Sequence, residues 1–185
     1  MNLQPTQLEG CFIIEPKVFG DERGYFFESF NQQKFQELTG YDTVFVQDNQ
    51  SYSTKGVLRG LHFQTGQSAQ AKLVRVIKGE VLDVAVDLRA GSKTYGKHFS
   101  LIISEKNNKQ LFIPRGFAHG FIVLSDDAIF QYKCDNYYDK AAEGGIHYAD
   151  PDLNIDWILP HEQLIVSAKD LELPRAYNFG GLLNQ

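Results

Sequence analysis

Apolar and polar residues alternate along several short segments of the chain, most clearly at residues 82–88. There Asp83, Ala85 and Asp87 occupy one face, and four aliphatic residues occupy the other. A period of two residues is typical of a β-strand whose two faces differ in polarity. The pattern therefore predicts a strand with one polar face.

Seven further segments also have the composition of strands, and turn sequences such as residues 78–80 and 89–92 separate them. Strands that recur at roughly 8–12-residue spacing, without helices between them, are typical of a sandwich or closed barrel rather than of βαβ units. The segments are Phe12–Ile14, Tyr25–Phe30, Lys72–Ile77, His98–Ser104, Gln110–Ile113, Gly120–Leu124 and Ile129–Cys134.

One helix is predicted at Gln32–Leu38, because Asn31 provides an N-cap and Gly40 ends the helical pattern. After Asp150, prolines limit any helix to short pieces. We expect this C-terminal part to wrap the barrel and bring residues to its mouth. The whole chain, residues 1–185, is expected to form a single all-β domain with short peripheral helices.

Composition narrows the class of protein. A chain of 185 residues with 43% hydrophobic content can bury one core and does not demand a second domain. Cys11 and Cys134 are too few for a disulfide framework, so buried thiols are expected.

A net charge of −5 disfavours binding to nucleic acid. No segment approaches the ~20 apolar residues of a membrane span or has the features of a signal peptide, so no membrane partner and a cytoplasmic location are expected.

Polar side chains concentrate in residues 47–51 and in the segment Val57–Gln64, where Arg59 and His62 lie among apolar residues. Burying a guanidinium and an imidazole requires partners or a ligand. From these residues alone, a satisfied core histidine at His62 and a structural ion pair at Arg59 remain open alternatives to a functional site.

Residues 114–121 have the spacing P-x-G-x-x-H-G-F, which resembles the second motif of the cupin barrels. Metal-binding cupins join this histidine to an H-x-H pair and a carboxylate from the first motif. Here the pair is missing, because Gln64 follows His62 two positions later. One imidazole is a poor site for zinc or iron, which need about three protein ligands. The sequence thus predicts a cupin-like double-stranded β-helix, or jelly-roll barrel, with no metal and no other cofactor.

Five polar residues lie on or beside predicted strands and are expected to line one cavity. Each of them alone also fits a surface or structural role. Together, a base, a phenol and an ammonium describe proton transfer beside a carbonyl group. The five are His62, Lys72, Asp83, Asp87 and Tyr132.

Several long motifs occur in the order found in a known family, including Phe19–Glu28, Val57–Gln64, Pro114–Phe121 and Ser167–Asp170. Such an ordered set is far more specific than any one motif. Over nearly its whole length the chain resembles the dTDP-4-dehydrorhamnose 3,5-epimerase family.

The resemblance implies a homodimeric isomerase that converts dTDP-4-dehydro-6-deoxy-D-glucose to dTDP-4-dehydro-L-rhamnose in dTDP-L-rhamnose biosynthesis. It implies His62 as the base, Asp170 as the carboxylate that orients His62, and Tyr132 as the acid on the opposite face. A cation such as Lys72 would stabilise the enolate. Tyr138 would stack on thymine, and the other implied ligand contacts are Arg23, Glu28, Gln47, Asp48, Asn49, Arg59, Lys72, His119, Glu143 and Lys169.

Two other functions remain open. A single-site 3- or 5-epimerase, or a 3,4-ketoisomerase, would share the barrel, the nucleotide and the base. A non-catalytic cupin that binds a nucleotide sugar belongs to another class. The presence of a base, an orienting carboxylate and an acid argues against it, because binding alone needs no such set.

Overall fold

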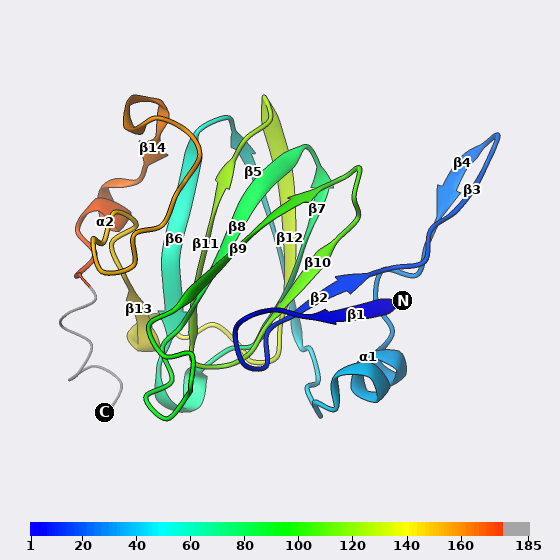
Figure 1. The fold of residues 1–185 in the computed structure, drawn as a ribbon, viewed down its shortest axis with the longest axis horizontal. Coiled ribbons are helices and arrows are strands. Elements are labelled where there is room, and N and C mark those ends of the chain that lie inside the picture. The colour runs from blue at the N-terminus through cyan, green and yellow to red at the C-terminus, as the bar shows by residue number, and fades with distance from the viewer. Residues whose placement is uncertain (176–185) are drawn as a thin grey trace.

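Two facing β-sheets make up most of the computed structural model, which describes residues 1–175 (Figure 1). One sheet has the strand order β1-β2-β10-β7-β12-β5, and the other has the order β13-β6-β11-β8-β9, with β14 parallel to β6. The strands are β1 (Asn2–Pro5), β2 (Phe12–Glu15), β3 (Phe19–Asp21), β4 (Gly24–Phe26), β5 (Gln47–Thr54), β6 (Val57–Gln64), β7 (Lys72–Lys78), β8 (Glu80–Asp87), β9 (His98–Ser104), β10 (Gln110–Ile113), β11 (Phe117–Val123), β12 (Asp127–Cys134), β13 (Glu143–Gly145) and β14 (Ile165–Val166). The helices are α1 (Gln32–Thr39) and α2 (Ala168–Leu171), with short 3₁₀ turns at Gly66–Ser68, Lys140–Ala142 and His161–Gln163.

The main core lies between the two sheets, where side chains from both inner faces pack together. Val74 and Phe130 come from one sheet, and Val81, Ala85 and Phe121 from the other. Consecutive strands cross between antiparallel sheets, as in a jelly roll. The predicted all-β barrel is therefore confirmed.

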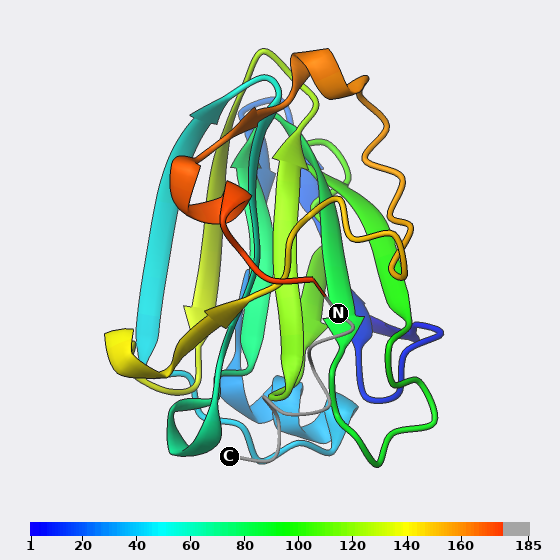
Figure 2. The ribbon, with the colours of Figure 1, turned by 90° about the vertical axis from the view of Figure 1, so that its left-hand side faces the viewer.

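The C-terminal segment covers the outer face of the β6-β11-β8 sheet (Figure 2). Tyr148, Leu153 and Trp157 pack against Val84 and Val86 of β8. Both faces of β8 are consequently buried, and the polar face predicted from the alternation points into the barrel. The expectation that the C-terminal part wraps the barrel is confirmed.

Helix α1 packs on the outer face of the other sheet. Asn31 caps it by accepting a hydrogen bond from the Lys34 backbone N–H at 3.0 Å, and Gly40 ends it with a φ of 71°. The buried ring of Phe35 lies 5.0 Å from that of Phe112, centroid to centroid. The helix prediction is confirmed to within one residue.

Each predicted strand overlaps an observed one, but two long strands were missed. β5 and β6 contribute polar side chains to an internal cavity, and these replace some of the apolar positions of an ordinary strand. The predicted strand Tyr25–Phe30 is wrong beyond Phe26, where β4 ends.

The β3–β4 hairpin stands away from the two sheets (Figure 1). Its apolar side chains are open to solvent, with exposed fractions of 55% for Phe19, 63% for Tyr25 and 71% for Phe26. A two-stranded ribbon with no core of its own is marginal in water. These rings therefore lack the cover that aromatic residues usually have.

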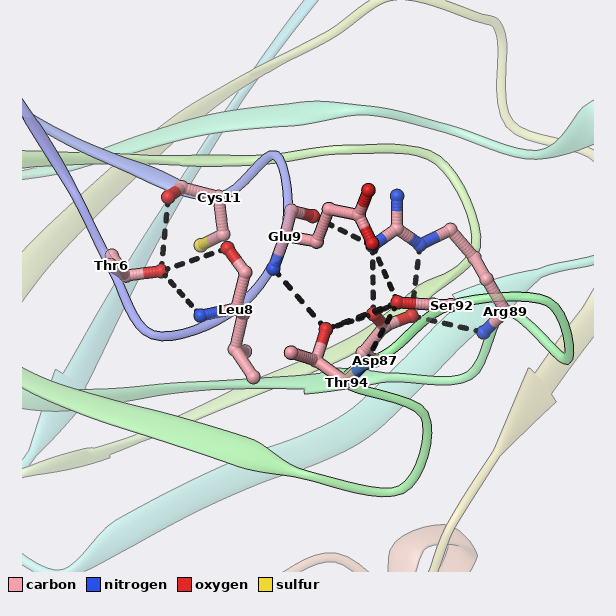
Figure 3. Close-up of polar contacts among 8 residues, drawn as sticks. All are labelled: Thr6, Leu8, Glu9, Cys11, Asp87, Arg89, Ser92 and Thr94. Carbon is pink, nitrogen blue, oxygen red and sulfur yellow. Dashed lines mark hydrogen bonds and ion pairs between the residues drawn. The ribbon is translucent and has the colours of Figure 1, made fainter.

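Asp87 does not line a cavity with His62, contrary to the expectation from its place on β8. Its buried carboxylate accepts hydrogen bonds from Arg89 Nε at 2.9 Å and from Thr94 Oγ1 at 2.6 Å (Figure 3). Arg89 also donates to the Glu9 carbonyl at 2.6 Å. The network joins the loop after β8 to the loop before β2. Burial favours a higher pKa for Asp87, but these donors outweigh it and lower the pKa to about 2.

Candidate active site

A cavity of about 660 Å³ opens between the sheets and gathers most of the predicted site residues. Strands β5, β6, β7, β11, β12 and β13 and helix α2 all contribute to its wall. The predicted residues that line it are Asn49, Arg59, His62, Lys72, His119, Tyr132, Tyr138, Glu143, Lys169 and Asp170.

His62 and Asp170 form a close pair although 108 residues separate them. His62 Nε2 lies 2.7 Å from Asp170 Oδ1, and the Gly60 backbone N–H donates to Oδ2 at 3.3 Å. Ser167 caps α2 by accepting from the Asp170 N–H at 3.1 Å. Burial acts to raise the pKa of Asp170, but hydrogen bonds from His62, Gly60 and Ser167 outweigh it and hold the pKa below its usual value.

The C-terminal segment reaches this position because β14 pairs with the strand that carries His62. Val166 lies opposite Leu58 in the parallel register, one residue before the cap of α2. Close contact between strands also shapes this wall. A Cβ on Gly60 would lie 2.7 Å from Gly120 Cα and 2.8 Å from the His119 carbonyl oxygen, so a side chain there would push β6 away from β11.

Tyr132 and Lys72 stand on the opposite sheet, on the adjacent strands β12 and β7. Lys72 Nζ lies 5.9 Å from the centroid of the Tyr132 ring. Burial lowers the pKa of Lys72 and raises that of Tyr132. The cavity thus holds an imidazole on one wall and a neutral phenol beside an amine on the other.

Tyr138, Glu143 and Lys169 form a connected group at the cavity rim. Glu143 Oε2 accepts from the Tyr138 hydroxyl at 2.9 Å and lies 2.7 Å from Lys169 Nζ. The hydrogen bond from Lys169 lowers the pKa of Glu143. Gln47 supports this rim by accepting from the Tyr138 N–H at 3.2 Å and donating to Asn49 Oδ1 at 3.1 Å. The Tyr138 side chain is exposed and available to a flat ligand.

Neither open alternative for the β6 motif fits the structure. The Arg59 side chain is exposed at the cavity and donates from Nε to Ser53 Oγ at 3.1 Å, and it makes no ion pair with any residue in 1–175. The His62 side chain is 31% exposed and faces the cavity, so it is not a core histidine.

Four predicted ligand contacts do not line this cavity: Gln47 only touches residues of its rim, and the other three lie away from it. Arg23 sits on the turn of the β3–β4 hairpin beside Asp21, and Glu28 pairs with Lys34 Nζ at 2.7 Å. Asp48 pairs with Lys133 Nζ at 2.9 Å, because its side chain points to the face of β5 opposite to that of Asn49. This geometry gives Asp48 no contact with the cavity.

Comparison with known proteins shows the family of the chain. A family model described as dTDP-4-dehydrorhamnose 3,5-epimerase matches residues 5–177. The chain belongs to that family. The Escherichia coli K12 dTDP-4-dehydrorhamnose 3,5-epimerase is 53% identical over 174 residues, which cover 94% of this chain and 93% of the relative.

A solved structure of an epimerase of this kind from Legionella pneumophila, in complex with dTDP-4-keto-L-rhamnose, superposes with a TM-score of 0.94. It is 52% identical, and the match covers 98% of this chain and 96% of that one. A Streptomyces niveus dTDP-4-dehydrorhamnose 3-epimerase is 37% identical over 186 residues, covering 96% of this chain and 90% of the relative.

Some parts of this epimerase-family site were missed from the sequence. Phe121 and Phe130 stack with centroids 4.1 Å apart and line the cavity, but aromatic residues on strands look like ordinary core. Ser167 could have been found, since a serine three residues before an acidic residue is the signature of a helix N-terminus.

No three histidine, cysteine, aspartate or glutamate side chains among residues 1–175 gather closely enough to hold a metal ion. Within the same part of the chain, no helix is long and apolar enough to cross a membrane. Cys11 and Cys134 are both buried and unpaired, as expected.

Proposed function

We propose that this protein is a dTDP-4-dehydrorhamnose 3,5-epimerase that inverts carbons 3 and 5 of dTDP-4-dehydro-6-deoxy-D-glucose. The observation that carries the proposal is the placement of the His62–Asp170 pair and Tyr132 on facing sheets of one cavity. Inversion needs a proton acceptor on one face of the sugar and a donor on the other. The names of the relatives supply the substrate.

His62 is the base. Asp170, fixed by Gly60 and by the cap of α2, orients the ring through Nε2 and stabilises the imidazolium that forms. The carbon acid beside a ketone is too weak for an imidazole unless negative charge on the enolate oxygen is stabilised. Lys72, in a poorly hydrated position, supplies that stabilisation electrostatically.

Tyr132 is the acid. Burial keeps its phenol protonated, because it raises the pKa above the usual value. A proton delivered from the β12 wall reaches the face of the enolate opposite to His62. The same two groups serve carbon 3 and carbon 5, with the same face of the substrate ring toward His62 for both proton abstractions.

The nucleotide half of the substrate binds at the rim. Arg59 presents an uncompensated guanidinium, the group best suited to a diphosphate, and the exposed ring of Tyr138 offers a stacking surface for thymine. Asn49, Glu143, Lys169 and His119 complete the polar wall, and Gln47 supports it through its hydrogen bonds to Asn49 and Tyr138. No cofactor enters this scheme.

The active form is a homodimer. Arg23 and Glu28 belong to or adjoin the exposed β3–β4 hairpin and lie away from the cavity of their own chain. A second copy gives the uncovered rings of Tyr25 and Phe26 a surface to pack on. It also lets Arg23 and Glu28 contact substrate in the cavity of that copy. Two buried free thiols fit a reducing cytoplasm.

Proton exchange followed by NMR in deuterated water tests this function. The substrate should take up deuterium at carbons 3 and 5, with formation of the L-rhamno product. Exchange must remain after exhaustive chelation, since the scheme uses no metal. Absence of exchange at either carbon would sink the proposal.

A single-site epimerase is the second candidate, because the Streptomyces niveus relative is named a 3-epimerase. A single-site epimerase would use the same barrel and the same base as a 3,5-epimerase. Exchange and inversion confined to carbon 3 would assign that function instead. Migration of the keto group from carbon 4 would assign a 3,4-ketoisomerase.

A further inference from the structure

The barrel interior contains a second histidine–carboxylate pair that the scheme above does not explain. Asp83 of β8 is fully buried, and its Oδ2 lies 2.8 Å from His119 Nε2. His119 lines the cavity, whereas Asp83 does not. Any influence of Asp83 on a bound substrate must therefore pass through His119 or through its charge.

The second oxygen of Asp83 is the unusual feature. Oδ1 is buried and accepts no hydrogen bond, and among residues 1–175 no other buried side-chain nitrogen or oxygen is left in this state. Buried polar atoms in native proteins are nearly always satisfied. A carboxylate that only braced two strands would be expected to use both oxygens. Asp83 instead leaves one carboxyl oxygen without a donor.

The ring of His119 is held in one orientation. Its Nε2 faces Asp83, and its face stacks on Phe130 with centroids 5.9 Å apart and planes 21° apart. A carboxylate accepts hydrogen bonds, so Nε2 carries the hydrogen of this pair. Nδ1 has no partner within the described chain, which leaves it as the polar ring atom that a ligand in the cavity can reach.

Other titratable groups act on the pair from the surrounding elements. Lys72 of β7 and His62 of β6 disfavour charge on His119, and Cys11, before β2, lies near Asp83. Burial is the main cause that lowers the pKa of His119, and Asp83 acts against it. Asp83 likewise favours the charged form of Lys72.

We propose that Asp83 is a positioning residue for the epimerisation. It holds His119 with Nδ1 toward the sugar and supplies the charge that lets His119 carry a proton there. Nδ1–H then donates a hydrogen bond to the 4-keto oxygen as enolate charge develops, beside Lys72. The proton stays on His119 throughout, so no atom is transferred. Two donors on one oxygen stabilise the enolate more than Lys72 alone. The role of the pair rests on the proposed function.

The variant Asp83→Asn separates charge from shape, because the amide oxygen can still accept from Nε2. We expect kcat to fall by roughly 10²-fold, as when an oxyanion donor is weakened, with dTDP binding unchanged. As the pH is raised, Asp83→Asn should lose activity at a lower pH than the wild type does. Nitrogen-15 NMR of the imidazole should show a lower His119 pKa.

Asp87→Asn is the matched control. Asp87 is on the same strand and equally buried, but its carboxylate serves the Arg89 network. It should lower Tm and leave the pH profile and the kcat per folded molecule unchanged. If the two variants behave alike, Asp83 is merely structural and the inference is wrong.

Two further measurements keep the inference falsifiable. The His119 pKa is read without substrate, so a wild-type value in Asp83→Asn overturns the inference even if the proposed function fails. If Asp83→Asn does not fold, His119→Asn replaces it. Near-normal kcat in His119→Asn, with dTDP still bound, would show that no hydrogen bond from His119 matters.

Discussion

The role proposed for a residue of this cavity depends on which of the two sheets carries it. His62 and Tyr132 sit on strands of different sheets and face one cavity, so in the proposed reaction a flat enolate between them would present one face to each. Their residue types suggested proton transfer from the sequence alone. Asp170, the partner of His62, comes from a helix 108 residues away and was found by resemblance only.

Tyr132→Phe tests the two-face scheme at this scale. The ring still fills its space, so folding and dTDP binding should change little, while the proton donor is lost. His62 should still exchange protons on the original face. We expect deuterium to enter with retained configuration, and product formation to fall by roughly 10²–10⁴-fold. NMR of the recovered sugar measures both.

His62→Asn is the companion variant. It should bind dTDP, whose contacts lie on other side chains, and exchange no substrate proton. If Tyr132→Phe formed the inverted sugar at a near-normal rate, the acid would be another residue or water.

At the scale of elements, short pieces of irregular chain decide the geometry of the site. Helix α2 has four residues and cannot be stable alone, so β14 and the Ser167 cap hold it against β6. The loop after β8 depends in the same way on the buried Asp87–Arg89 network shown in Figure 3.

Ser167→Ala should loosen Asp170 without removing it. Losing an N-cap costs about 1 kcal/mol. Because the helix is so short, the effect should appear in catalysis as a lower kcat, with dTDP affinity and Tm nearly unchanged. Asp170→Asn should lower kcat much more, since it also removes the charge that stabilises His62 in its protonated form. If Ser167→Ala lowered Tm clearly, and lowered kcat only as far as the loss of folded protein explains, the cap would serve only stability.

The Asp87 network should make the protein acid-sensitive. The pKa of Asp87 is about 2 in the folded chain, below the 3.8 of a free carboxyl, so the folded state prefers the ionised form. That contribution is complete above about pH 4 and disappears as pH falls toward 2. It amounts to roughly 2 kcal/mol. Urea unfolding should give Asp87→Asn a lower free energy of unfolding than the wild type at pH 7. This difference should shrink below pH 4.

A matched surface substitution calibrates that measurement. Lys109 lies 3.5 Å from Glu15 in a partly exposed pair, and such pairs contribute little. Lys109→Ala should change the free energy of unfolding by only about a few tenths of a kcal/mol, both at pH 7 and at pH 3. A gap for Asp87→Asn that stays constant between pH 7 and pH 3 would contradict the assignment.

At the scale of the whole molecule, the exposed hairpin fits the proposed homodimer, in which a second copy of the chain would cover it. The core between the sheets and the outer layers around it are continuous along residues 1–175. A single domain remains a prediction, and one cooperative urea transition with coincident optical probes would support it.

Mixing inactive variants tests the shared site. We expect Arg23→Ala and His62→Asn each to lose most activity, and their co-expressed mixture to regain part of it. In the mixed dimer, one cavity combines the intact His62 of one chain with the intact Arg23 of the other.

The control mixture pairs His62→Asn with Tyr132→Phe. Both residues belong to the cavity of their own chain, so no mixed dimer contains an intact site and activity should stay lost. Equal recovery in both mixtures, or a monomer by light scattering at working concentration, would refute the shared-site dimer.

Local patterns were enough to predict the all-β class, helix α1 and several strands, because alternation, caps and turn residues act within a few positions. They also grouped five polar residues in one cavity, where the structure places His62, Lys72 and Tyr132 in the lining but neither Asp83 nor Asp87. They failed at β5 and β6, where a polar cavity wall replaces the apolar face of a strand. No local pattern paired His62 with Asp170, which only the resemblance implied. Only tertiary structure joined Arg89 to the Glu9 carbonyl and kept Arg23 out of its own cavity. Such pairings depend on which strands face each other across the barrel, and residues far apart in the chain share no local signal that encodes it.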